Sequence, residues 1–300
     1  MGWFCEYTIQ AKRISWNLTL VSSPTQFYCI NYIENQEKAM FVFEITTPGT
    51  WLDSEDKDWS WRIEGQLRSL KSHFFEANAA LNLFASTQSV RPVFADREIR
   101  RRDFQRRSEI QHAVEQELGK RMSHENWDEI LFESEVRFKR EKWGIGGIPR
   151  EFEHNLPFFY ARAFLYALDA FDKFLGVLAK EPHLPPRIAH LHQQIAEDFP
   201  DLRGVRNTSQ HLEDRSRGLG SGRNPKPLEL KPIANNLISA PGGALVLNCL
   251  NGSKYGSTMA DGHYGEIDVS PQSMQRLQSV LQELLSLFKW HGPKEHSPSG

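Results

Sequence analysis

The chain has 300 residues, 39% of them hydrophobic, so it is long enough to bury one large core or two small ones. Its 36 Lys and Arg residues stand against 38 Asp and Glu residues, and the resulting net charge of -2 excludes a global attraction to nucleic acid or anionic lipid. A site for a polyanion must therefore come from local clustering of basic residues.

Cysteine usage and hydropathy favour a cytoplasmic protein that does not enter a membrane. Cys5, Cys29 and Cys249 lie far apart and form no CxxC pair, which is typical of a reduced compartment. The most apolar run, residues 156–180, is interrupted by charged side chains that a membrane span tolerates poorly. The first thirty residues also lack the pattern of a secretory signal.

The N-terminal part of the chain divides into a poorly defined segment, residues 1–39, and a helical region, residues 40–148. For residues 1–39 two explanations stay open: weak order, or an upstream choice of start codon ahead of Met40. Apolar residues at three- and four-residue steps predict a helix over residues 59–84. Two further helices are expected, over about 94–118 and 125–142. The Gly and Pro cluster at residues 143–151 is then the best candidate for a domain boundary.

The C-terminal part, residues 149–292, reads as a second set of helices with a small β insertion. Helices are expected over about 153–180 and 187–198, followed by a loop at 218–227. Residues 244–250 and 264–270 have strand character, and Asp261-Gly262 predicts a turn between them, so we expect a β-hairpin or a three-stranded insertion. Ser270 as N-cap and Pro271 at the first helical position predict a closing helix, and residues 293–300 a disordered tail.

The stretch DLRGVRNTSQHLEDRSRG, residues 201–218, has the densest group of chemically useful side chains. If residues 200–217 form one helix, Leu202, Val205 and Leu212 share an arc of roughly 80° that faces a core. A second arc, about 100° wide and roughly opposite, then holds Asn207, His211, Asp214 and Arg215. Arg206 lies about 140° from His211, so its long side chain must bend round to join that histidine.

An Arg and a His in this arrangement suit phosphate chemistry. Imidazole moves a proton near neutral pH, and guanidinium offers planar donors to a phosphodiester or to its transition state. His211 would act on the ribose 2′-hydroxyl or on the leaving oxygen, Arg206 would stabilise charge on the phosphoryl group, and Asn207 would orient the substrate or His211. Arg203 and Arg215 are candidates for substrate binding, and no metal or other cofactor is expected.

The residues RNTSQH, from Arg206 to His211, resemble the Rx4-6H motif of the HEPN superfamily (higher eukaryotes and prokaryotes nucleotide-binding), in which the residue after the Arg is often Asn, Asp or His. The resemblance covers roughly residues 150–290. It implies a mainly α fold, an up-and-down helical bundle, here with a small β-hairpin insertion and an additional N-terminal helical region.

By the same resemblance, the chain would be a metal-independent endoribonuclease whose site forms at a homodimer interface. Its substrate would be RNA, and a toxin-antitoxin, phage-defence or stress-response setting with an antitoxin or other partner protein is implied. Carried over by position, Arg206 and His211 are the catalytic candidates, and Asn207 is the supporting polar residue.

Alternatives remain open for each basic cluster. The motif stretch also reads as a solvated helix face with an ion pair between Glu213 and Arg217, or as the binding surface of a non-catalytic protein-interaction or nucleotide- and RNA-binding module. The segment REIRRRDFQRR, residues 97–107, is either a solvated charged helix face or a track for an RNA backbone, and it has little aromatic interleaving.

Overall fold

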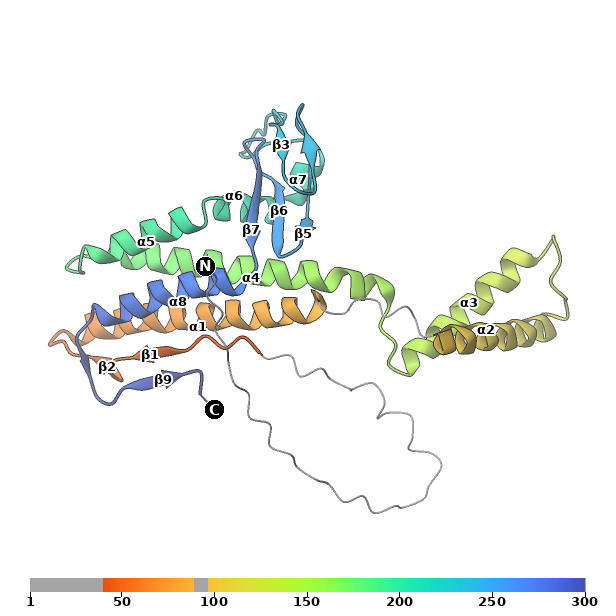
Figure 1. Cartoon of the computed structure of the whole chain (residues 1–300), viewed down its shortest axis with the longest axis horizontal. Helices are drawn as coiled ribbons and strands as arrows, with labels where there is room; N and C mark the ends of the chain where they lie inside the picture. Colours follow the sequence, from red (N-terminus) through yellow and green to blue (C-terminus); the bar gives the residue numbers. More distant parts are fainter. Residues whose placement is uncertain (1–39, 89–96, 300) are drawn as a thin grey trace, which may run out of the picture. The chain divides into compact units, whose positions relative to one another are not determined.

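The computed structural model describes residues 40–88 and 97–299 (Figure 1). The expectations for residues 1–39, including the choice between two start sites, fall outside the described residues. The described part is mainly helical. Its helices are α1 (Lys57–Gln88), α2 (Arg97–Leu118), α3 (Trp127–Gly144), α4 (Arg150–Leu178), α5 (Arg187–Asp198), α6 (Leu202–Gln210), α7 (Leu212–Ser216) and α8 (Pro271–Ser286).

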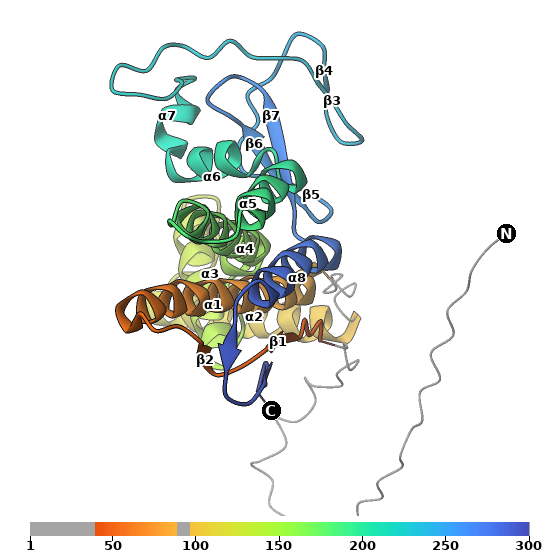
Figure 2. The ribbon, with the colours of Figure 1, turned by 90° about the vertical axis from the view of Figure 1, so that its left-hand side faces the viewer.

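The main core lies between α1, α4 and α8, which run side by side in both views (Figures 1 and 2). Helix α4 buries an apolar side chain at every third or fourth position, because a 3.6-residue turn returns those positions to one face. Arg62 near the start of α1 pairs with Glu181 just beyond the end of α4 at 3.3 Å, so these two helices are antiparallel.

Helices from both sides of the Gly and Pro cluster at residues 143–151 therefore share one core. Helix α1 precedes that cluster and α4 follows it, yet buried side chains of both belong to the same apolar cluster. Residues 40–148 and 149–292 are thus not two separately packed units. Helices α2 and α3 contact each other around a small core of their own, formed by Ile110, Val114, Ile130 and Phe138.

Short strands close the edge beside α1 and α8. They are β1 (Ile45–Thr47) paired with β9 (Glu295–Ser297), and β2 (Trp51–Leu52) paired with β8 (Trp290–His291), both antiparallel. For residues 295–297 the pairing of β9 corrects the expectation of a disordered tail over residues 293–300, because the edge of β1 offers them backbone hydrogen-bond partners. Gln282 of α8 holds β1 in turn, accepting from Thr46 N and donating to Thr46 O.

The expected β insertion is confirmed, but only residues 249 and 250 of the expected strand 244–250 lie in a strand, and the strand over residues 254–258 was not predicted. The strands are β3 (Ile233–Ala234), β4 (Ser239–Ala240), β5 (Cys249–Asn251), β6 (Lys254–Thr258) and β7 (Tyr264–Asp268). Strands β5, β6 and β7 form an antiparallel sheet, and Gly262 takes a φ of 85° in the predicted turn. The sheet is joined to α6, since Thr208 donates to the Thr258 carbonyl and Asp201 accepts from Glu266 N.

The closing helix is also confirmed. Ser270 takes an extended conformation, its Oγ accepts from Ser273 N, and Pro271 is the first residue of α8. Among the helices of residues 40–88 and 97–299, none has an apolar stretch long enough to cross a bilayer.

Candidate functional site

The motif stretch, residues 201–218, forms two helices and not one. Helix α6 ends at Gln210, His211 has φ -126° and ψ 44°, and α7 starts at Leu212. This corrects the expectation of a continuous helix over residues 200–217. At the break, His211 N donates to the carbonyls of both Asn207 and Thr208, a shared hydrogen bond that is common where a helix ends.

Arg206 is held on α4 by a buried carboxylate. Arg206 Nε lies 2.9 Å from Asp169 Oδ2, and Arg206 Nη1 donates to Asn207 Oδ1 at 2.8 Å. Asp169 is only 7% exposed. The guanidinium is thus fixed at two points, which reduces the entropy that a substrate contact would otherwise cost.

The same carboxylate also binds a lysine. Lys173 Nζ donates to Asp169 Oδ2 at 2.6 Å, so one negative charge faces the two cations Lys173 and Arg206. The group keeps one net positive charge. An anion placed beside Arg206 is therefore attracted to it despite the ion pair.

His211 stands apart from Arg206. Its side chain is 57% exposed, and its Nδ1 lies 3.6 Å from Glu213 Oε1. Within the part of the chain that the structure describes, no hydrogen bond or ion pair joins His211 to Arg206. In one copy of the chain, Arg206 and His211 are therefore close in sequence but make no direct contact.

Three ligand-type side chains converge at the junction of α6 and α7. His211, Glu213 and Asp214 each offer one atom, and these atoms lie within 4.8 Å of one another. Imidazole and carboxylate together suit zinc and similar divalent cations. A cation held there would occupy the His211 imidazole and prevent it from transferring a proton.

The two arginines predicted to bind substrate have different environments. Arg203 is exposed on α6. Arg215 is 1% exposed, and its Nη1 donates to the carbonyls of Leu219 and Gly220, so its guanidinium fixes the loop after α7 and is not presented at the surface. The helical wheel placed Arg215 beside His211 because it assumed one continuous helix.

A histidine that the sequence did not assign lies close to the motif helix. His192 Nε2 of α5 is 3.2 Å from Asp172 Oδ1 of α4. The ring lies against Gly176, where an added Cβ would be 2.9 Å from Nε2. Burial raises the pKa of the Asp172 carboxyl, while the charges of His192 and Arg203 act to lower it. Sequence spacing gives no sign of this pair, because its members are on different helices.

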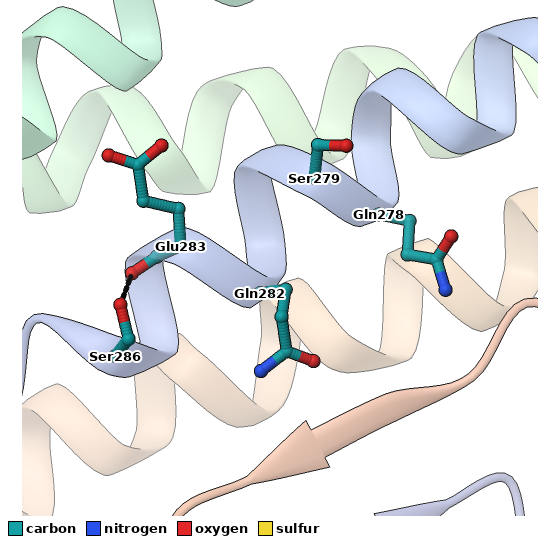
Figure 3. A pocket seen from close by; sticks show the side chains of 5 residues that line it. All are labelled: Gln278, Ser279, Gln282, Glu283 and Ser286. Carbon is teal, nitrogen blue, oxygen red and sulfur yellow. Dashed lines mark hydrogen bonds between the residues drawn. The ribbon is translucent and has the colours of Figure 1, made fainter.

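Two surface hollows lie away from the motif. The first, on α8, is lined by Gln278, Ser279, Gln282, Glu283 and Ser286, whose side chains all project from this one helix (Figure 3). Most of these groups are already engaged; Gln278 donates to the Glu44 carbonyl, and Glu283 pairs with Arg187. The second is lined by residues of the α5 end, β6, β7 and α8, Arg276 among them. Neither hollow includes Arg206 or His211.

Comparison of the chain with protein-family models, with curated proteins and with solved structures finds no match.

Proposed function

We propose that the chain is a metal-independent endoribonuclease of HEPN type, with Arg206 and His211 as its catalytic pair. The observation that carries the proposal is the anchored guanidinium of Arg206, held by Asp169 and Asn207, five positions before an exposed histidine at the end of the same helix. A fixed cation and an accessible imidazole are the two groups that metal-free cleavage of RNA needs.

In the proposed reaction the 2′-oxygen of the ribose attacks the adjacent phosphorus. His211 takes the proton of the 2′-hydroxyl while water protonates the 5′-oxygen, or it protonates the 5′-oxygen while water takes the proton of the 2′-hydroxyl; the bond from phosphorus to the 5′-oxygen breaks, leaving a 2′,3′-cyclic phosphate and a 5′-hydroxyl. Arg206 binds the non-bridging oxygens as charge develops on them. Asn207 positions Arg206, since its side-chain oxygen accepts from Nη1.

A homodimer is part of the proposal. Arg206 and His211 do not contact each other in one chain, so a second copy that brings its own pair opposite the first would complete the site. Such a dimer would act in the cytoplasm in a defence, toxin-antitoxin or stress-response setting, with an antitoxin or another partner protein controlling it.

A non-catalytic role is the second candidate, and one observation favours it. The ion pair with Asp169 accounts for Arg206 without any substrate, as expected of a residue that fixes α6 on α4. The motif face would then bind a nucleotide, RNA or a partner protein without cleaving it. Cleavage and binding assays separate the two candidates.

The test is cleavage of single-stranded RNA in EDTA by the wild-type protein and by His211→Ala and Arg206→Ala. We expect each substitution to reduce the rate by about 100-fold or more, the usual effect of removing an acid-base group or a charge-stabilising donor. The matched control is His263→Ala, because His263 is 60% exposed and also lies beside a carboxylate, Asp261. Equal rates for His211→Ala and His263→Ala would contradict the assignment.

A further inference from the structure

Five of the six arginines of α2 fall into two structurally distinct sets. Arg106 binds Glu141 and Glu109, and Arg107 lies 3.1 Å from Glu135 and over the ring of Phe138. The pKa of Glu141 is lowered by the hydrogen bonds that Arg106 donates to it. These two guanidinium groups are therefore neutralised by carboxylates within the α2 and α3 pair.

Arg97, Arg101 and Arg102 form the second set. All three are exposed, and among residues 40–88 and 97–299 no carboxylate pairs with any of them. The carboxylates of α3 reach Arg106 and Arg107, nearer the middle of α2, so Arg97, Arg101 and Arg102 keep their positive charge. Local charge of this kind attracts a polyanion even though the whole chain has a net charge of -2.

A large aromatic ring lies on the same face of α2 as Arg97 and Arg101, whereas Arg102 lies about 100° further round the helix. At 100° per residue, Arg97, Arg101 and Phe104 fall within an arc of about 60°, whose centre is about 150° from the buried Ile110 and about 110° from the buried Val114. Phe104 is 76% exposed, although a phenylalanine normally contributes its ring to a core. The face therefore combines spaced cations with an uncovered aromatic surface.

We infer that the exposed face of α2 binds single-stranded RNA, with Arg97 and Arg101 on successive phosphates and Phe104 stacked on a base. Guanidinium groups on phosphates together with stacking on aromatic rings are the two elements by which proteins hold single strands. Duplexes do not offer unstacked bases to Phe104. The choice of RNA over other single strands rests on the proposed function, for which this face would capture the substrate.

The experiment measures the affinity of the full chain for a fluorescein-labelled oligouridylate by fluorescence anisotropy, across a salt series and in EDTA. His211→Ala is the background for every variant, so that the proposed cleavage does not consume the probe. Arg97→Ala/Arg101→Ala should weaken binding at least tenfold and reduce the slope of log affinity against log salt by about 1.4, since each phosphate contact on a single strand contributes about 0.7.

Two matched controls separate this face from general electrostatics and from general hydrophobicity. Arg106→Ala/Arg107→Ala removes the same charge from the same helix and should weaken binding less than threefold, since both side chains are already paired. Phe104→Ala should weaken binding about fivefold or more, the loss of one stacked base, whereas Phe132→Ala on α3, 72% exposed, should leave it unchanged.

Equal effects of the two double substitutions, wild-type affinity of Phe104→Ala, or no RNA binding at all would each overturn the inference. RNA binding with the expected dependence on α2 but without cleavage by the wild-type protein would support the inference and refute the proposed nuclease. A cleavage rate that does not change when Arg97, Arg101 or Phe104 is substituted would support the proposed nuclease and refute the inference.

Discussion

Asp169 of α4 and Arg206 of α6 form a partly buried ion pair, with Arg206 Nε 2.9 Å from Asp169 Oδ2. The pair ties the motif helix to α4, one of the helices that form the main core. It is thus both a support for the fold and the means by which the proposed catalytic guanidinium is positioned.

We predict that Asp169→Asn lowers the free energy of unfolding by about 1–3 kcal/mol, less than for a fully buried pair because Lys173 and Arg206 both reach solvent. Urea unfolding followed by circular dichroism measures this. Glu213→Gln, which alters an exposed carboxylate next to the motif, should change stability by less than about 0.5 kcal/mol. An unchanged unfolding midpoint for Asp169→Asn would show that the pair does not fix α6.

Arg215→Ala should lower the free energy of unfolding and should not act by removing a contact to RNA. Its buried guanidinium donates to two loop carbonyls, and leaving those acceptors without a donor should cost about 2–4 kcal/mol. The control is Arg217→Ala, because Arg217 is a nearby exposed arginine that pairs with Asp214. A variant of Arg215 with wild-type stability and weakened RNA affinity would instead support substrate binding by Arg215.

Gly256 in β6 should tolerate no side chain. A Cβ added there would lie 2.7 Å from the Gly265 carbonyl oxygen of the paired strand. We expect Gly256→Ala to lower the free energy of unfolding by about 1–3 kcal/mol through this overpacking. Gly242→Ala, which meets nothing within 4 Å, should cost nothing measurable, so comparable losses from the two substitutions would contradict the close strand approach.

Stability should fall at alkaline pH through Tyr255. Burial raises the pKa of Tyr255 to about 12 from an ordinary 10.0, and its hydroxyl donates to Asn248 Oδ1. Because the pKa is higher in the folded chain, this contribution is complete below about pH 10 and is lost as pH rises towards 12. From about pH 9 to pH 11 the loss attributable to this side chain should be about 1 kcal/mol.

Urea unfolding at several pH values, compared between the wild-type protein and Tyr255→Phe, isolates that contribution from the titration of other groups. The variant has no hydroxyl at residue 255 to ionise, so its stability should fall less steeply over the same interval. Parallel pH profiles for the two proteins would refute the role of Tyr255.

Local signals in the sequence were sufficient for several elements. The N-cap Ser270 with Pro271 located the start of α8, and apolar periodicity located α1 and α5 within a few residues. The Asp261-Gly262 turn and the strand after it were also located, but the strand before the turn was expected over residues 244–250 and is β6, Lys254–Thr258. Each of these signals depends on neighbours close in the chain.

Contacts between residues that are distant in the sequence could not be predicted from such local signals. Asp169 and Arg206 meet only because α6 packs on α4, and His192 meets Asp172 for a similar reason. The burial of Arg215 follows from the break at His211, which a helical wheel cannot show. The HEPN-type activity itself stays a prediction, supported by the motif and by the anchored Arg206.

The most direct test of the central claim is the chemical identity of the RNA ends that the purified protein leaves in EDTA. Metal-independent attack by the 2′-oxygen predicts 2′,3′-cyclic phosphate and 5′-hydroxyl ends from the wild-type protein and no such ends from His211→Ala. Intact RNA with the wild-type protein, or cleavage that survives in His211→Ala, would contradict it.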